Sequence, residues 1–518
     1  MAGTLLRRLA KDPMPNRSSD DPISPQRKLA EAPLLNAETA APDDPAWLSQ
    51  PIRGLVRKSP VVIEPEDTIQ QAAARMRDAK VSSVLLMRES ELLGIVTDRD
   101  LRNRVLAEGV EGTQPVQQIA TLRPRTLAAN AAAFEALLLM TEQGIHHLPV
   151  EENGQIIGVL TAGDLAQRQS TSVIYLVREI GRQGDIPGLA RAAARVADLQ
   201  RQLAASTTPA STTGRIVTSI TDAVTRRLLQ LAHADMGPAP IPYVWVAAGS
   251  QARREQTARS DQDNCMILDD AYDEPVHGEY FRALSRFVCD GLDACGYVHC
   301  PGEMMAMTDT WRQPLARWKA YFDQWIHRPE PKALMLTSVF FDLRTIGGEP
   351  TLLDALRAQT LAATRGNSLF LAHLAGNALQ HRPALGWLGQ LSTEGAGEHR
   401  GRIDLKHKGA VPVIDLARIF ALAAGAPEVN TFDRIEAAAR EGTLSAAAAK
   451  DLAEALELIG RIRLDHQARQ TAMGERPDNF VAPSELSNLA RRQLQDAFKV
   501  IQTLQSVLQQ RYGGGSYK

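Results

Sequence analysis

An internal repeat with an offset of 64 residues constrains the fold of this chain more than any other feature of its sequence. Each copy reads as strand, amphipathic helix, two strands and a further helix, a βαββα unit. A unit of this size leaves one face of its small sheet uncovered, so we predict that the two copies pair. The identities that define the offset are Pro60 and Pro124, Met76 and Met140, Gly94 and Gly158, Thr97 and Thr161, Asp100 and Asp164, and Leu101 and Leu165.

The later part of each copy carries the pattern Thr-x-x-Asp, most clearly in Gly94–Asp100. A threonine before a helix and an acid three positions later form a capping box, which stabilises the helix whether or not a ligand binds. The repeat and this pattern also resemble a tandem pair of CBS domains. That resemblance implies an adenine nucleotide bound between the copies at Thr97, Asp100, Thr161 and Asp164, and a homodimer formed through the CBS pair. Both readings of the pattern stay open.

A second motif lies between two apolar runs in the middle of the chain. The first run ends at Gly249-Ser250, and Asp261 and Asp263 lead into the second. Side chains alternate along a strand, so both aspartates would project from one face, where they repel each other unless a cation such as Mg²⁺ lies between them. The Gly-Ser turn would bring backbone N–H groups and a hydroxyl close to a phosphate. Each element alone is common in loops and at strand edges, but their order predicts a nucleotidyl-transfer site.

The residues around this motif resemble the nucleotidyltransferase domain of bacterial CBS-domain signal-transduction proteins. That domain is similar to the uridylyltransferase of the nitrogen PII system and belongs to the polymerase-β-like superfamily. The resemblance covers nearly all of the chain from about residue 50. The family usually has glycine where Ala252 stands. The added methyl group would either tighten the phosphate loop or make a positive φ costly there, and either effect would bear on turnover more than on fold. The segments that carry the resemblance are Gly249–Thr257, Ser260–Asn264, Cys300–Gly302, Trp311–Pro314, Ser338–Arg344, Asp404–Gly409 and Asp415–Arg418.

Three carboxylates are the candidate catalytic and metal-binding residues. Two Mg²⁺ ions can stabilise the attacking and leaving oxygens in nucleotidyl transfer, and we expect Asp261 and Asp263 to hold them. The resemblance implies a third carboxylate on a later strand, for which Asp342 is the best candidate, completing one metal site and helping to deprotonate the acceptor. The alternative for Asp342 is an ion pair with Arg344 at the end of a strand.

The candidate residues for binding the nucleoside triphosphate surround the Gly-Ser turn. Gly249 and Ser250 would hold the β- and γ-phosphates. Arg253 or Arg254 could add charge, because a guanidinium fork suits phosphate oxygens. The alternative is that one of the two faces solvent or pairs with Glu255.

Composition narrows the class of protein. At 518 residues the chain is too long for one core. A net charge of −2 and an aromatic content of 5% argue against a nucleic-acid polymerase or a tRNA-modifying enzyme. The sequence contains no run of eighteen apolar residues, so no membrane span is predicted. The four cysteines lack Cys-x-x-Cys spacing, so reduced thiols in a cytoplasmic protein are expected, not zinc ligands or disulfides.

We therefore predict a multidomain protein of α/β and α class. A basic cluster in its helical part, Lys406-His407-Lys408, would be either a solvated helix edge, which we favour, or a contact for an acidic or phosphate-bearing partner. The predicted parts are a flexible N-terminal arm (1–48), a tandem CBS pair (49–168), a helical connector (169–237), a polymerase-β-like nucleotidyltransferase α/β domain (238–350), a C-terminal helical bundle (351–512) and a flexible tail (513–518).

The function expected from these features is a cytoplasmic, CBS-regulated nucleotidyltransferase. It would move NMP from an NTP to a hydroxyl group of a protein or a small molecule, with no nucleic-acid or membrane partner. The alternative is a catalytically inactive scaffold that senses adenine nucleotides, an option for which Ala252 leaves room.

Overall fold

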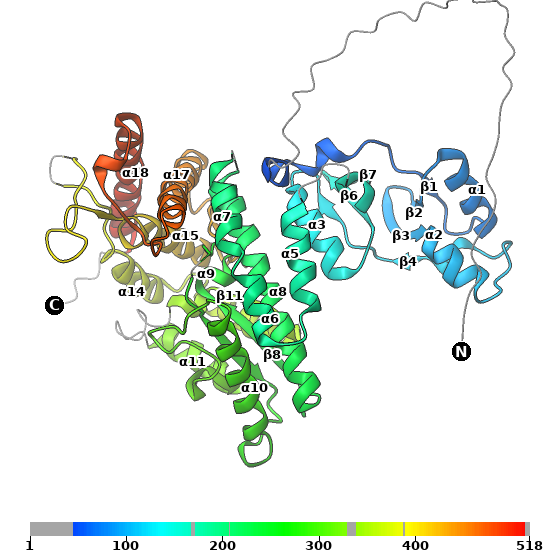
Figure 1. Ribbon diagram of the computed structural model, residues 1–518, viewed down its shortest axis with the longest axis horizontal. Helices are drawn as coiled ribbons and strands as arrows, with labels where there is room; N and C mark the ends of the chain where they lie inside the picture. Colours follow the sequence, from blue (N-terminus) through cyan, green and yellow to red (C-terminus); the bar gives the residue numbers. More distant parts are fainter. Residues whose placement is uncertain are drawn as a thin grey trace, which may run out of the picture. The chain divides into compact units, whose positions relative to one another are not determined.

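The computed structural model describes residues 45–166, 171–206, 208–258, 260–328, 338–386 and 389–512 (Figure 1). Most of the predicted arm (1–48) and the predicted tail (513–518) lie outside the described residues. The end of the predicted arm is structured: Pro45–Ser49 forms a short 3₁₀ helix whose Trp47 and Leu48 side chains are buried. Their apolar side chains belong to the same hydrophobic core as the second repeat.

Both copies of the repeat fold in the predicted order; their equivalent helices and longer strands begin 64 residues apart, and their short first strands begin 65 residues apart. In the first copy, a parallel pair β1-β2 and an antiparallel pair β2-β3 belong to a sheet of order β1-β2-β3-β4. The second copy has the sheet β5-β6-β7, with its strand irregularity at the equivalent place. The elements are β1 (Val62–Ile63), α1 (Ile69–Ala79), β2 (Ser83–Arg88), β3 (Glu91–Thr97), α2 (Asp98–Asp100), β4 (Thr121–Leu122), β5 (Leu127–Ala128), α3 (Ala133–Gln143), β6 (His147–Glu152), β7 (Gln155–Thr161) and α4 (Ala162–Ala166).

The segment predicted as a connector contains four helices, α5 (Thr171–Arg182), α6 (Ile186–Ala193), α7 (Val196–Ala205) and α8 (Ala210–Met236). The last of them is more than a linker. Buried residues occur along most of α8, and its apolar side chains share a core with the next sheet. This long helix is therefore structurally part of the domain that follows it.

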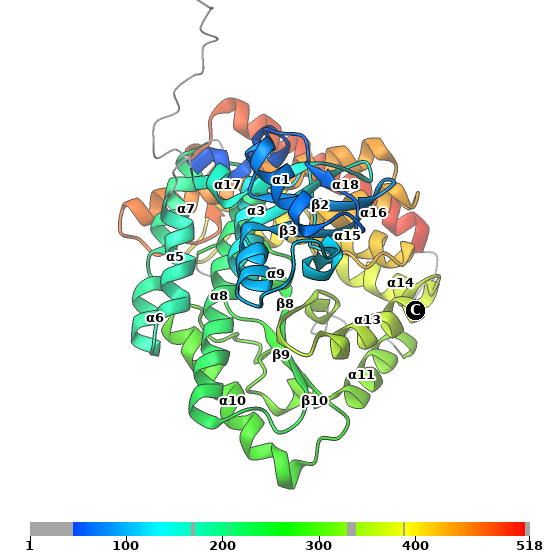
Figure 2. The same cartoon turned by 90° about the vertical axis from the view of Figure 1, so that its right-hand side faces the viewer.

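That domain is built on a sheet of order β10-β9-β8-β11, in which β9-β10 is parallel and the other pairs are antiparallel. Side chains of β8 alternate between two cores: Val244 and Val246 face α11 and α13, whereas Tyr243 and Trp245 face α8 and α10. Figure 2 shows α10 and α11 on opposite sides of the strands. Both faces are thus covered, which explains why β8 and β9 are continuous apolar runs. The elements are β8 (Tyr243–Ala248), β9 (Asn264–Leu268), α10 (Glu274–Ala294), β10 (Arg312–Pro314), α11 (Leu315–His327), β11 (Leu343–Gly348) and α13 (Pro350–Thr364).

The remaining part is mainly helical, as the apolar periodicity of the sequence predicts, and the predicted multidomain α/β and α class is confirmed. The small pair β12-β13 is the exception to its helical character. None of the helices within the described residues is both long enough and apolar enough to cross a membrane. The elements are α14 (Ser368–Ala378), β12 (Ile403–Asp404), α15 (Val411–Ala424), α16 (Thr431–Arg440), α17 (Ala446–Ala472), β13 (Phe480–Val481) and α18 (Asn488–Tyr512).

Candidate functional site

Asp261 and Asp263 lie just before β9, on the same side of the chain. The residue between them, Gln262, is buried and donates from Nε2 to the carbonyl oxygens of Cys289 and Tyr297, both at 2.9 Å. Because Gln262 is anchored inward, its two neighbours project outward, as strand alternation predicts. The acidic pair is therefore held in place by an amide on the opposite side of the chain.

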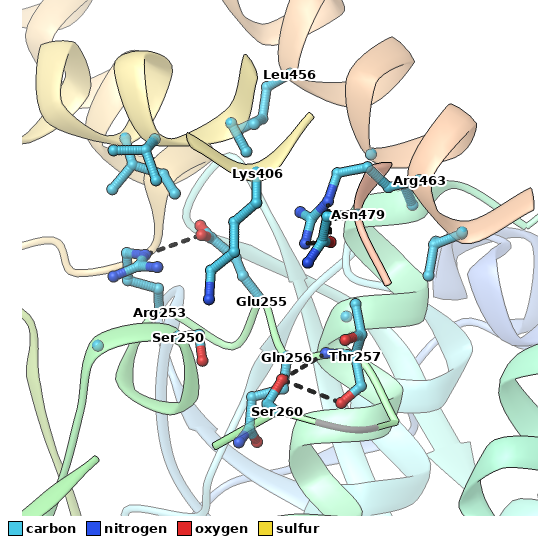
Figure 3. A pocket seen from close by; sticks show the side chains of 18 of the residues that line it. Ser250, Arg253, Glu255, Gln256, Thr257, Ser260, Lys406, Leu456, Arg463 and Asn479 are labelled. Carbon is cyan, nitrogen blue, oxygen red and sulfur yellow. Dashed lines mark hydrogen bonds and ion pairs between the residues drawn. The ribbon is translucent and has the colours of Figure 1, made fainter. Parts of the chain in front are cut away.

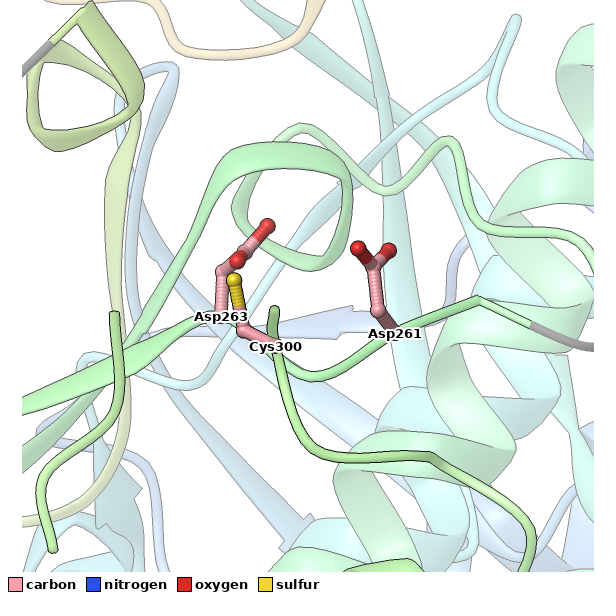
Figure 4. Close-up of side chains that lie close together, drawn as sticks. All are labelled: Asp261, Asp263 and Cys300. Carbon is pink, nitrogen blue, oxygen red and sulfur yellow. The ribbon is translucent and has the colours of Figure 1, made fainter. Parts of the chain in front are cut away.

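A thiol completes a group of three possible metal ligands. One ligand atom each from Asp261, Asp263 and Cys300 lies within 4.8 Å of the others (Figure 4). Burial and the charge of Asp261 raise the pKa of Asp263 to about 6, and burial and the charge of Asp263 raise the pKa of Cys300 to about 11. A bound divalent cation would relieve this repulsion. Residue spacing offers no signal for Cys300, since its thiol reaches Asp263 from a loop 37 residues later in the chain.

The Gly-Ser turn forms the start of α9 (Gly249–Ala252), directly beside the acidic pair. Gly249 has a φ of +55°, and a Cβ atom there would lie 2.9 Å from Oδ2 of Asp263 and 2.8 Å from Cγ2 of Val339. Glycine is thus required both by the backbone and by the space. Ala252 is buried in the short helix and is not among the positive-φ residues, so its methyl group carries no backbone cost there.

Asp342 is not in the group of possible metal ligands within the described residues. Its carboxylate is fully buried and accepts hydrogen bonds from three guanidinium groups, those of Arg253 at 2.6 Å, Arg418 at 2.6 and 3.0 Å, and Arg434 at 2.5 Å. These contacts do not fit the third metal ligand or the base that we expected, because both oxygens are already engaged. Nor is Arg344 its partner: Arg344 pairs with Asp222 of α8.

The two arginines that follow the Gly-Ser turn, Arg253 and Arg254, have different surroundings. Arg253 is buried and pairs with Glu255 as well as with Asp342. Arg254 is exposed and has a positive φ of 59°. The sequence left open which of the two arginines would face solvent or pair with Glu255. In the structure Arg254 faces solvent and Arg253 pairs with Glu255.

The acidic pair, the Gly-Ser turn and Arg253 line a cavity of about 360 Å³. The walls of this cavity come from three parts of the chain. The nucleotidyltransferase-like domain supplies the acidic pair and Ser250, α7 supplies Gln200, and the helical part supplies Lys406 and Arg463. Figure 3 shows Lys406 and Arg463 directed into the space above the loop that carries Ser260. The cavity therefore brings together a phosphate loop, carboxylates and cations.

The three residues of the basic cluster that we predicted to be a solvated helix edge have different surroundings. His407 pairs with Asp404, and Lys408 pairs with Glu394 at 2.6 Å. Lys406 lines the cavity, so for this residue the favoured prediction is wrong. No periodicity could single it out, because it lies in a single π-helical turn after β12.

The Thr-x-x-Asp motifs form capping boxes in both repeats. Oγ1 of Thr97 donates to Oδ2 of Asp100 at 2.7 Å, and the N–H of Asp100 donates back to Oγ1 of Thr97 at 3.4 Å. Thr161 and Asp164 repeat this arrangement at 2.6 and 3.2 Å. The capping role is thus seen directly, and binding of a nucleotide by these four residues stays a prediction.

Comparison with family profiles finds matches along most of the chain. Residues 52–107 and 116–170 each match the CBS domain. Residues 194–332 match the family described as "Putative nucleotidyltransferase DUF294", and residues 368–512 match its "Putative nucleotidyltransferase substrate binding domain". The match at residues 194–332 begins within the predicted connector and includes α7 and α8. This agrees with the packing of α8 against the sheet that follows it.

Individual relatives are similar to the CBS region. The chain is 36% identical over 135 residues to CBS domain-containing protein CBSCBSPB2 of Arabidopsis thaliana, covering 24% of this chain and 25% of that protein. It is 30% identical over 110 residues to CBS domain-containing protein YhcV of Bacillus subtilis, covering 21% of this chain and 79% of that protein. The solved CBS domain protein PAE2072 from Pyrobaculum aerophilum complexed with AMP is 25% identical, with a TM-score of 0.22, over 22% of this chain and 90% of that one.

Proposed function

The chain belongs to the CBS-domain proteins that carry a nucleotidyltransferase domain of the DUF294 family and its C-terminal substrate-binding domain, and from this premise we propose that it transfers NMP from an NTP to a hydroxyl group of a protein or small molecule. The observation that carries the proposal is the acidic pair beside a glycine-dependent phosphate loop, in a cavity that also holds cations. Carboxylates for a metal ion and donors for phosphates are the two requirements of this chemistry.

Asp261 and Asp263 would hold a divalent cation, for which we propose Mg²⁺. When bound, the ion supplies positive charge at the reacting phosphate. The residues fit such an ion because their oxygens converge and because burial and the neighbouring carboxylate raise the pKa of Asp263. We propose one Mg²⁺ ion where two were expected from the sequence, because the carboxylate of Asp342, the expected third ligand, is paired with arginines.

The chain's own residues would orient the triphosphate. The hydroxyl of Ser250 would donate to the phosphates, and Gly249, whose own N–H donates to the carbonyl oxygen of Asp342 at 3.2 Å, would let them approach closely; these fixed positions would hold the α-phosphorus in line with the acceptor. The hydroxyl oxygen of the acceptor forms a bond to the α-phosphorus, and the bond to the bridging oxygen breaks. Pyrophosphate leaves and the hydroxyl proton passes to solvent.

The alternative is an inactive scaffold, and the absence of a positive φ at Ala252 removes the backbone argument for it. We propose that the CBS pair instead regulates the transferase, with an adenine nucleotide at Thr97, Asp100, Thr161 and Asp164, in a cytoplasmic homodimer formed through the CBS pair. Regulation of this kind requires that nucleotide binding at each site alters affinity at the other.

The test is transfer of label from each of the four α-³²P-labelled NTPs, with Mg²⁺ and cell lysate, followed on protein and small-molecule fractions. We expect label with the wild type and at least a hundredfold less with Asp261→Asn/Asp263→Asn, because removal of charge stabilisation costs about this factor or more. The matched control is Asp235→Asn, an exposed aspartate of α8, which should transfer at the wild-type rate. Absence of label from every NTP, with and without AMP, would reject the proposal.

A further inference from the structure

Two of the cations in the cavity have no carboxylate at ion-pair distance among the residues that the structure describes. Of the lysines and arginines that line it, Arg253 and Arg418 pair with carboxylates. Within the described parts of the chain, neither Lys406 nor Arg463 has a carboxylate oxygen at ion-pair distance, whereas neighbours such as Lys408 and Arg461 do. A partly buried positive charge without a partner is costly and is usually compensated by a ligand.

Arg463 is held in a fixed orientation. Its Nε and Nη2 donate to Oδ1 of Asn479 at 3.1 and 2.8 Å, and among the described residues Nη1 has no hydrogen-bond partner. The amide of Gln467 also donates to Oδ1 of Asn479, at 3.3 Å. A neutral acceptor thus positions the guanidinium without neutralising it, which leaves its charge directed into the cavity.

Both cations lie within electrostatic reach of the phosphate loop. Burial lowers the pKa of Arg463 to about 10 against the opposing charges of Asp404 and Glu255, and the charge of Lys406 opposes the burial that raises the pKa of Asp263 to about 6. The N–H of Glu255 donates to the carbonyl oxygen of Ser250 at 2.9 Å, so Glu255 is adjacent to the turn. Lys406 and Arg463 therefore approach, from the helical part, the same space that Ser250 borders from below in Figure 3. Gly249 lines this cavity as well.

We propose that Lys406 and Arg463 clamp the β- and γ-phosphates of the nucleoside triphosphate from the side opposite to the phosphate loop. The proposal rests on the proposed function and makes the triphosphate tail the ligand that joins the two domains. Discrimination between NTP and NMP then comes from the helical domain, because NMP lacks the phosphates that these cations contact.

Binding of nucleotides to the full-length protein tests the clamp. The probes are the non-hydrolysable α,β-methylene analogues of the four NTPs, the matching NMPs and pyrophosphate, titrated calorimetrically with Mg²⁺. The transferase site is recognised as the binding event lost in Asp261→Asn/Asp263→Asn. For Lys406→Met and Arg463→Gln we expect affinity for the analogue to fall about tenfold or more, as loss of a charge-assisted hydrogen bond implies, while affinity for NMP changes less than about twofold.

Matched variants separate the clamp from damage to the fold. Lys408→Met and Arg461→Gln lie close by in the chain, but both side chains are paired and do not line the cavity; they should bind as the wild type does. Lys406→Arg and Arg463→Lys should restore part of the lost affinity. The clamp is overturned if Lys406→Met and Arg463→Gln bind the analogue normally, if NTP and NMP affinities fall together, or if only transfer to the acceptor is lost. Loss of no binding event in the double aspartate variant would instead reject the proposed function.

Discussion

Three guanidinium groups converge on the single carboxylate of Asp342, and this contact joins three segments of the chain. Arg253 follows the phosphate loop, Arg418 belongs to α15 and Arg434 belongs to α16. All four side chains are buried. At the scale of the residue, Asp342 therefore positions the arginine of the phosphate loop and fixes the helical part to the sheet.

Asp342→Asn should destabilise the protein strongly, because it leaves three buried guanidinium groups short of one negative charge. Breaking a buried ion pair from one side costs about 3–5 kcal/mol, and we expect a loss of this size in thermal or urea unfolding at pH 7. The arginines lower the pKa of Asp342, so its stabilising effect is present above the unfolded pKa and is lost as the pH falls through the lower folded value. The difference between wild type and variant should therefore shrink in strong acid.

The control is Asp235→Asn, which should unfold as the wild type does. Calorimetric titration with Mn²⁺ gives the second readout. A variant with normal stability that has lost Mn²⁺ binding would show that Asp342 is a metal ligand after all.

The partners of Asp342 could not be found from the sequence. They stand 76 to 92 residues away along the chain, whereas the spacing of the sequence offered Arg344 as the neighbour. Asp261 and Asp263 differ in this respect, since alternation over three residues fixes their common side. The common side of Asp261 and Asp263 was therefore predictable from the sequence. The arginines that pair with Asp342 from other parts of the chain were not.

At the scale of the element, α7 connects the CBS side of the chain to the acidic loop. Oε1 of Gln200 accepts from the N–H of Ala258 at 2.6 Å, and its Nε2 donates to Oε1 of Gln467 in α17 at 3.1 Å. Ala258 precedes Asp261 by three residues. A shift of α7 would therefore be felt both at the acidic pair and in the helical wall of the cavity.

Gln200→Met should weaken the response of transfer to an adenine nucleotide, because it removes both hydrogen bonds and keeps a similar volume. We expect the ratio of transfer rates with and without AMP to move to within about twofold of unity, the coupling being about 1–3 kcal/mol in allosteric systems. The measurement is the labelling assay with and without AMP. Gln202→Met, at an exposed position of the same helix, should retain the response. An unchanged AMP effect in Gln200→Met would exclude this route.

The elements themselves were largely predictable. The repeat gave the CBS pair its strands and helices, and apolar periodicity indicated helices in the C-terminal part. The role of α8 was not predictable, because a periodic apolar face shows that a helix is buried without naming the surface that covers it. Its buried Thr218 and Asp222 contact the phosphate-loop region, the first through the N–H of Gln256 and the second through Gln251 and Arg344.

At the scale of the whole molecule, the proposed homodimer needs an apolar surface on the CBS pair. Several large hydrophobic side chains exposed within the described residues lie in this region, among them Leu106 at 79% and Leu122 at 54% exposure. An exposed leucine alone is ordinary, but several large apolar side chains exposed on the pair that is expected to associate are the natural candidates for contact with a second copy. Covering these side chains would add to the stability of the dimer.

Leu106→Asp/Leu122→Asp should therefore convert a dimer into a monomer. Light scattering after size-exclusion chromatography should give twice the 56.5 kDa chain mass for the wild type and a single chain mass for the variant. Two charges placed in an apolar contact would lose their hydration without gaining partners. Leu489→Asp is the matched control, since Leu489 is 67% exposed at the start of α18, outside the CBS pair, and it should remain dimeric. A wild type of single mass at micromolar concentration would exclude the homodimer. A double variant that stays dimeric would place the interface on another surface.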